Sequence, residues 1–287
     1  RDVYRWLHDQ TMRRANMGLV PTEIAEEMSM PGVFTGHSHV QGYYGTVSHN
    51  TKSVYNRYLG WYDGNPANLN PHPPVPSAER YLEFMGGADE VLRRARQSFE
   101  EGDYRWVAQV VNHVVFADPD NTEARALQAD ALEQMGYQAE SGTWRNAYLM
   151  GARELRQGSP SFPAAGGRQL GHAMTAEQLV DSIGMRFQPE RFEPDTAGFN
   201  LHLTDLDEHH VLGVARSAVH HDPDTVRSDA DVSIVTTRET LVLILGGLAT
   251  LDDAMADGRL EHTGTIETFG HFLDCLERFI TPGLIEP

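Results

Sequence analysis

A chain of 287 residues with a net charge of −18 at pH 7 presents an acidic surface that repels the phosphate backbones of nucleic acids. Its 40% hydrophobic content allows one large domain or two ordinary ones, and its single cysteine, Cys275, excludes an internal disulfide framework. The longest apolar run, residues 241–249, is far too short to cross a bilayer, and no basic-then-apolar leader is present. Cytoplasmic, periplasmic and secreted locations stay open. The first residue is Arg1, which indicates either processing or a missing upstream portion.

Residues 1–157 are predicted to be almost wholly helical. "VYRWLHDQTMRRAN" predicts an amphipathic helix ending at Gly18, and "PTEIAEEM" predicts a short second helix with a proline at its start. "SHNTKSVYNRYLGW" predicts a third helix with Ser48 as its N-cap. Further helical segments follow as far as residue 157: "SAERYLEFM", "GADEVLRRARQSFEEG", "DYRWVAQVVNHVVFADP", "TEARALQADALEQMG" and "SGTWRNAYLMGARELRQG".

The segment "YLGWYDGNPANLNPHPP", residues 58–74, cannot continue a helix because its prolines restrict φ and remove hydrogen-bond donors. Trp61 and Tyr62 offer a large contact area at little rotamer cost. The segment also contains these prolines, together with asparagines whose side chains can hydrogen-bond nearby backbone: Pro66, Pro71, Pro73, Pro74, Asn65, Asn68 and Asn70. We interpret the segment as a rigid strap that lies across another domain or across a twofold-related subunit.

An internal repeat is indicated within "EGDYRWVAQVVNHVVFADPDNTEA", which has the opening and closing residues of a tetratricopeptide-like helix pair. Gly102 and Gly136 are 34 residues apart, the period of that repeat. An ordinary αα-hairpin is the alternative. Either structure requires a neighbour for one apolar stripe, which consists of Val107, Val110, Val111, Val114 and Val115.

Residues 158–172 are rich in Gly, Pro and Ser and read as a linker. Residues 173–287 then predict a small α+β domain. "GFNLHLTDL", "HHVLGVARSAVHH" and "DADVSIVTT" are typical of antiparallel strands, and "RLEHTG" of a further short strand. Helices are predicted for "TAEQLVDSIGMRF", "RETLVLILGGL", "TLDDAMADG" and "TIETFGHFLDCLERFI".

Several histidines are candidate ligands or catalysts. His37 and His39 form an HxH pair that could bind one metal, but no third ligand stands at a suitable spacing. The pairs His209-His210 and His220-His221 are expected to be surface histidines that flank a hairpin. His8 precedes Asp9 on one helix, where neighbouring residues do not face each other. Cys275 lies in an apolar stripe with Phe272 and Phe279, which favours core packing. The residues alone therefore indicate neither a catalytic set nor a metal site.

A resemblance appears at "GYYGTVSHNTKSVYNRYLGWYDGNPANLNPHPP" and continues through "LHDQTMRRAN", "GDYRWVAQVVNHVVFADPDN" and "ARALQADALEQMGYQAESGTWRNAYLMGARELR". Residues 1 to about 157 resemble the segment that follows the catalytic domain in bacterial alkylsulfatases of the metallo-β-lactamase superfamily, enzymes that cleave dodecyl sulfate and similar detergents. The remainder is similar to the sterol-carrier-protein-2-like domain of that family, above all "VSIVTTRETLVLILGG" and "TLDDAMADGRL".

The resemblance implies four regions: a helical segment with the strap (1–75), a tetratricopeptide-like dimerisation domain (76–157), the linker (158–172) and a sterol-carrier-protein-2-like domain (173–287). It implies two zinc ions in the parent enzyme, held by an HxHxDH motif and further ligands that this chain does not contain. A tyrosine after the first helices helps to hold the sulfate in that family. Tyr58 is the best match, and Tyr55, one turn earlier, is the competing register.

The resemblance therefore implies part of a zinc-dependent alkylsulfatase that hydrolyses alkyl sulfate esters to alcohol and sulfate, with this chain alone inactive. We expect a homodimer, and an apolar pocket for alkyl tails beside "TLVLILGGL", with a filled core as the alternative to the pocket. The alternative function is a non-catalytic, dimerising carrier of lipids or alkyl chains.

Overall fold

The structure is a computed structural model that describes residues 1–159, 171, 173–278 and 285. The chain contacts divide it into two compact units, residues 1–160 with 282–287, and residues 161–281. The expected linker, 158–172, lies almost wholly outside the described residues. No helix among the described residues is long and apolar enough to span a membrane.

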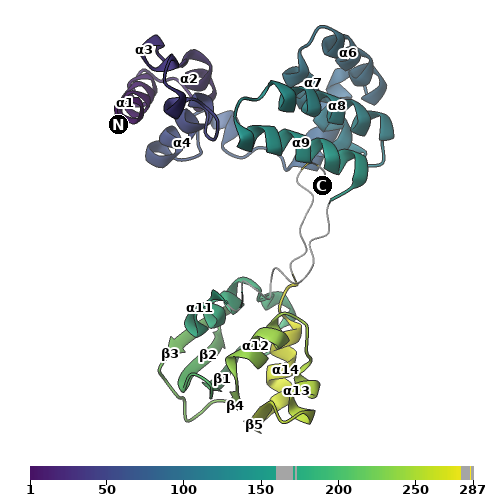
Figure 1. Ribbon diagram of the computed structural model, residues 1–287. Helices are drawn as coiled ribbons and strands as arrows, with labels where there is room; N and C mark the ends of the chain where they lie inside the picture. Colours follow the sequence, from purple (N-terminus) through teal and green to yellow (C-terminus); the bar gives the residue numbers. More distant parts are fainter. Residues whose placement is uncertain (160–170, 172, 279–284, 286–287) are drawn as a thin grey trace. The chain divides into compact units, whose positions relative to one another are not determined.

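The first unit begins with a group of helices that share one small core (Figure 1). Its elements are α1 (Asp2–Ala15), α2 (Pro21–Glu27), α3 (Gly32–Thr35), the 3₁₀ turn η1 (Ser38–Val40) and α4 (Val47–Leu59). Leu7 of α1, Ile24 of α2 and Tyr55 of α4 are buried against one another, together with Met28. The strap contains the 3₁₀ turn η2 (Pro66–Asn68) and leads into α5.

The rest of the first unit is a stack of helices around α7 (Figure 1). Its elements are α5 (Pro74–Met85), α6 (Ala88–Glu100), α7 (Tyr104–Ala117), α8 (Thr122–Gln138) and α9 (Gly142–Gln157). Asp103, Asn121 and Ser141 cap α7, α8 and α9, each accepting a hydrogen bond from a backbone amide three residues on. The expected valine stripe of α7 is fully buried and packs on α5, α6 and α8. Ile285 packs on the same core.

The second unit is a five-stranded sheet with helices (Figure 1). Its strands are β1 (Thr196–Leu203), β2 (Glu208–Ala215), β3 (Ala218–Pro223), β4 (Val232–Thr236) and β5 (Leu260–Gly264), in the order β3-β2-β1-β4-β5. Its helices are α11 (Ala176–Asp181), α12 (Arg238–Leu245), α13 (Leu251–Ala256) and α14 (Ile266–Asp274), with the 3₁₀ turns η3 (Ser182–Met185) and η4 (Pro189–Arg191).

One face of this sheet is buried and the other is more polar. Phe199, Leu201 and Leu203 of β1 alternate inward, and they form one core with apolar side chains of α11 to α14. Asn200 and His202 alternate to the opposite face. The expected order of a helical part followed by a small α+β domain is therefore confirmed.

Three details differ from the sequence-based expectations. Thr46, not Ser48, caps α4, because its hydroxyl accepts from the His49 amide at 2.9 Å. β4 pairs with β1 in parallel, so the strands are not all antiparallel. Gly136 lies inside α8, where a Cβ would stand 2.9 Å from Leu149 of α9. The 34-residue spacing therefore marks a close helix contact at Gly136 and not a second turn equivalent to Gly102.

The first helix also ends earlier than expected. α1 stops at Ala15, and Gly18 adopts its left-handed conformation (φ 91°) in the turn that follows. In the second unit, α14 ends at Asp274, and Phe279 of the predicted stripe lies outside the described residues.

Candidate functional site

The two tyrosines proposed for sulfate binding occupy different environments. Tyr55 is 7% exposed and belongs to the core of α1, α2 and α4. Tyr58 is 57% exposed in the last turn of α4. Only Tyr58 therefore has a side chain that a ligand could reach without unpacking the core.

Tyr58 lies in a short hydrogen-bonded chain with the first helix. Its hydroxyl is 3.1 Å from Nε2 of His8, and Nδ1 of His8 is 2.8 Å from Oδ1 of Asp9. The hydrogen bonds from His8 and from Arg5 lower the pKa of the Asp9 carboxyl, which therefore stays ionised. The expectation that His8 and Asp9 do not meet is wrong, because their side-chain tips converge although the two residues are adjacent.

The protonation of His8 decides what Tyr58 can donate. When the imidazole is neutral, its Nδ1–H donates to Asp9 and its Nε2 acts as an acceptor. The Tyr58 hydroxyl then donates its proton to Nε2 of His8 and cannot donate it to an anion. When His8 is an imidazolium, Nε2–H donates to Tyr58, whose own proton becomes free for an anion. The arrangement can therefore couple anion binding to a proton on His8.

The strap is organised by its own hydrogen bonds. Asp63 accepts from the backbone amide of Asn65 at 2.9 Å and from the side-chain amide of Asn68 at 2.6 Å. Asn65 in turn accepts from the amide of Ala67 at 3.1 Å, which opens η2. Residues 64–74 are all exposed, and Trp61 is 72% exposed. The strap therefore holds a local conformation while it offers its side chains to solvent.

A cleft of about 960 Å³ opens between the α2 and α4 helices and the α7, α8 and α9 helices of the first unit. Gln128 in its wall donates to Asn112 at 3.0 Å, while its buried Oε1 has no hydrogen-bond partner among the described residues. Arg105 and Glu26 pair at 3.0 Å on the lining, and Lys52 lies over the Trp144 ring at 5.8 Å. The cleft can therefore accept a polar group at Gln128 beside an apolar one.

The core of the second unit lies between the sheet and the helices. Phe199, Phe269 and Phe272 pack ring against ring there. A surface recess of about 420 Å³ lies instead along α12 and α14. Its lining combines apolar side chains with two arginines and two aspartates: Ile244, Leu245, Leu251, Leu273, Leu276, Arg186, Arg278, Asp252 and Asp274. An alkyl chain could therefore be held at the surface of the helices, without entering the sheet.

One histidine of each pair expected at the surface is buried. The side chains of His210 and His221 are 3% and 5% exposed, and their Nδ1 and Nε2 atoms lie 3.0 Å apart. Asp181 of α11 lies 2.6 Å from Nδ1 of His221, and Glu208 lies 3.3 Å from Nε2 of His210. The expectation fails because His210 alternates in phase with Leu212 and Val214, toward the core.

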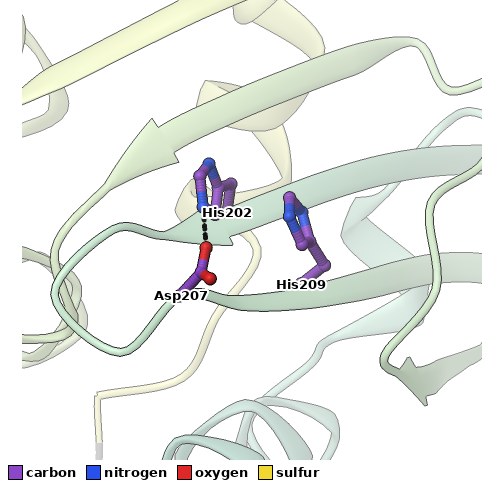
Figure 2. A group of neighbouring side chains, drawn as sticks. All are labelled: His202, Asp207 and His209. Atoms are coloured by element: carbon purple, nitrogen blue, oxygen red, sulfur yellow. Dashed lines mark ion pairs between the residues drawn. The ribbon is translucent and has the colours of Figure 1, made fainter.

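Cys275 is buried in the core of the second unit, as expected, and burial raises the pKa of its thiol. His37 and His39 are exposed in and beside η1, with ring centroids 5.6 Å apart. Among the described residues, one group has the composition and spacing of a metal site, and it is His202, Asp207 and His209 (Figure 2). None of these residues forms the HxHxDH motif of the implied zinc pair, so the described part of the chain does not fit that centre.

Comparison with known proteins assigns both units to alkyl sulfatase domain families. The family model "Alkyl sulfatase dimerisation" matches residues 20–158, and "Alkyl sulfatase C-terminal" matches residues 164–282. The alkyl/aryl-sulfatase BDS1 of Saccharomyces cerevisiae is 45% identical over 264 residues, which are 92% of this chain and 41% of that protein. A linear primary-alkylsulfatase of Pseudomonas sp. is 41% identical over 97% of this chain and 42% of its own length.

A solved structure agrees with these matches. The stereoselective inverting sec-alkylsulfatase Pisa1 from Pseudomonas sp. is 38% identical, with a TM-score of 0.92, over 100% of this chain and 45% of that chain. The fold and the matches define a pair of domains, one for alkyl sulfatase dimerisation and one from the alkyl sulfatase C-terminus. The chain belongs to the alkylsulfatase family, and it spans about two fifths of the length of the curated relatives that it matches.

Proposed function

We propose that this chain is the dimerisation and tail-binding part of a zinc-dependent alkylsulfatase, which hydrolyses alkyl sulfate esters of the dodecyl sulfate type to alcohol and sulfate. The observation that carries the proposal is the similarity of both units to alkylsulfatases over nearly the whole chain. Two zinc ions bound outside this chain would supply a hydroxide at neutral pH and stabilise the charge that develops on the sulfate.

A chimaeric protein tests this function directly. The zinc-binding portion of the Pseudomonas linear primary-alkylsulfatase is joined to this chain in place of its own C-terminal part. We expect the chimaera to hydrolyse dodecyl sulfate and to contain zinc, and the 287-residue chain alone to release no sulfate. Hydrolysis by the isolated chain at an enzymatic rate would contradict the proposal. An inactive but folded, zinc-loaded chimaera would favour the carrier function instead.

The first unit supports self-association as a homodimer. Among the described residues, the large aromatic side chains that are exposed all belong to it: Tyr4, Tyr43, Tyr44, Tyr58, Trp61, Tyr81, Phe84, Trp106 and Tyr137. Exposed apolar side chains that gather into a patch mark interaction surfaces, and aromatic residues are enriched in such interfaces. A stable homodimer interface commonly buries more than about 2,000 Å² and is rich in aromatic residues.

Sedimentation of the chain at micromolar concentration tests the dimer. Phe84 on α5 is 93% exposed, so we expect Phe84→Glu to shift the chain toward the monomer. The matched control is Val226→Glu, on an exposed loop of the second unit, which should leave the mass unchanged. A parent chain that sediments as a monomer would remove this part of the proposal.

The recess on the second unit supports binding of an alkyl sulfate tail. Its volume of about 420 Å³ lies in the range of small-molecule sites, and each buried CH₂ contributes about 0.8 kcal/mol. Burial and the neighbouring positive charge of Arg278 lower the pKa of Arg186. An anionic head group between the two arginines would reduce their repulsion, and it would have to stay on their side of the recess, away from Asp252 and Asp274.

Binding of decyl sulfate below its micelle concentration tests the recess by calorimetry. We expect Leu273→Gln to weaken binding by about three- to tenfold, since it replaces apolar wall with an amide. Val226→Gln is the control, because Val226 is exposed and does not line the recess. Equal affinities for both variants and the parent chain would refute tail binding at this recess.

We further propose that the strap docks on the zinc-binding portion and rims its active site. Its exposed prolines and aromatic side chains, held by Asp63, support this role because little entropy is lost when a preformed segment binds. Deletion of residues 65–74 from the chimaera should lower turnover without changing the zinc content. Unchanged turnover would contradict docking.

A further inference from the structure

The turn end of the β1–β2 hairpin brings three potential metal ligands together on the open face of the sheet (Figure 2). His202 of β1 and His209 of β2 are direct partners in the antiparallel register. Asp207 lies in the connecting turn with a φ of 54°. The three side chains therefore come from eight consecutive residues, and the hairpin itself fixes their proximity.

The distances among the ligand atoms are short. One nitrogen of each histidine and a carboxylate oxygen of Asp207 all lie within 4.8 Å of one another. Nε2 of His202 is buried and has no hydrogen-bond partner among the described residues, and its ion-pair contact with Oδ1 of Asp207 is 3.5 Å long. That separation is too long for a good hydrogen bond, so a buried polar nitrogen remains unsatisfied beside a carboxylate.

The two histidine rings lie close to each other. The His202 and His209 rings are stacked, with centroids 4.1 Å apart and planes 14° from parallel. Each ring can offer one nitrogen as a metal ligand. A neutral imidazole is the form that coordinates a metal ion.

We propose that His202, Asp207 and His209 bind one divalent transition-metal ion, with Zn²⁺ preferred. Two imidazoles and one carboxylate suit Zn²⁺, whereas Ca²⁺ and Mg²⁺ require oxygen ligands. Ligand atoms around a tetrahedral zinc stand about 3.3 Å apart, so the two imidazole rings must leave their stacked arrangement and tilt until their in-plane lone pairs converge, and the Asp207 side chain must rotate toward them. Asp207 is free to do so because its side chain is 94% exposed.

The bound ion would give the orphaned nitrogen of His202 a partner and would tie β1 to β2 beside their turn. Three protein ligands leave a fourth position for water or for a ligand from another molecule. The net charge of −18 also favours the binding of a cation.

Zinc titration of the full chain, prepared without a polyhistidine tag, tests the site. Competition with a chromophoric chelator should give one Zn²⁺ per chain. His202→Ala and His209→Ala should each weaken that affinity at least about tenfold, the loss typical even of an outer-shell partner. His262→Ala is the matched control, because His262 is an exposed histidine on β5 of the same sheet and should bind Zn²⁺ like the parent.

A variant that fails to fold would not obscure the result, because Asp207→Asn changes an exposed side chain. It should keep the metal-free melting temperature and lose affinity. Zn²⁺ should also raise the melting temperature of the parent chain but not that of the His202→Ala/His209→Ala variant. The proposal is overturned if no stoichiometric binding occurs, or if His202→Ala and His209→Ala bind Zn²⁺ as tightly as His262→Ala does.

Discussion

The Tyr58 hydroxyl lies 3.1 Å from Nε2 of His8, although 50 residues separate the two in the chain. This contact joins the last turn of α4 to α1 and leaves the tyrosine more than half exposed. The buried Tyr55, one turn earlier, has no comparable access.

Tyr58→Phe in the chimaeric sulfatase should raise KM for alkyl sulfates by about tenfold or more. A hydrogen bond to a charged group contributes roughly 1.5–3 kcal/mol, and the phenylalanine cannot donate one. Steady-state kinetics provides the measurement. Tyr55→Phe serves as the control and should leave KM unchanged, since the Tyr55 ring is buried in the core. Equal KM values for the parent and Tyr58→Phe would exclude a sulfate contact.

Tyr55→Ala should destabilise the first unit by about 3 kcal/mol, because it removes a large buried ring from a small core. Urea unfolding can be followed by tryptophan fluorescence, which reports this unit alone, since Trp6, Trp61, Trp106 and Trp144 all lie in it. Tyr58→Ala removes an exposed ring and should cost at most about 0.5 kcal/mol. Similar losses for both variants would contradict the different burial of the two residues.

His113 should make the first unit less stable in mild acid. It stacks on Tyr81 with ring centroids 4.5 Å apart, and burial lowers its pKa below the usual value of 6.5. The folded state therefore binds a proton less readily than the unfolded state. This contribution to stability is complete above about pH 6.5 and declines as the pH falls below that value.

The measurement compares melting temperatures at pH 7.5 and pH 5 for the parent and His113→Phe, again by tryptophan fluorescence. The variant keeps a stacked ring but cannot be protonated, so its melting temperature should fall less on acidification. An identical fall in both proteins would show that His113 does not bind its proton differently in the two states.

His221→Gln should loosen the β2–β3 hairpin. The change breaks the contact with Asp181 and leaves the buried His210 without its imidazole partner, at a cost of about 1–3 kcal/mol. Hydrogen exchange of residues 208–223, followed by mass spectrometry, reports this hairpin. His220→Gln is the control, since His220 is exposed on the other face of β3, and it should leave the exchange rates unchanged.

Local patterns in the sequence predicted most helices and strands, because amphipathic periods and turn residues act over short distances. Contacts between residues far apart in the chain could not be predicted from these local patterns. The pattern "DADVSIVTT" predicts a strand but not which strand it pairs with, so the parallel pairing of β4 with β1 could not be predicted from it. Gly136 resembled a turn, and only the packing of Leu149 explains why a glycine is needed inside α8.

Some features of the candidate site residues could have been predicted from local periodicity, and others required knowledge of strand pairing. Tyr58 and Tyr55 could have been distinguished by helical phase, because Thr51 and Tyr55 lie one turn apart on the buried side of α4. His210 could have been recognised by its phase with Leu212 and Val214. The meeting of His202 with His209 needed the hairpin register, which the sequence alone left open.

The parallel pairing of β4 with β1 also sets an order for the assembly of the second unit. Strands β1 to β3 are joined by short turns and can pair through local contacts. Phe199 of β1 pairs with Val232 of β4, 33 residues later in the chain, and this pairing adds the fourth strand to the sheet. Closing that longer loop costs more chain entropy, so strands β1 to β3 should pair first. The pairing of β4 with β1 should then limit the rate of folding.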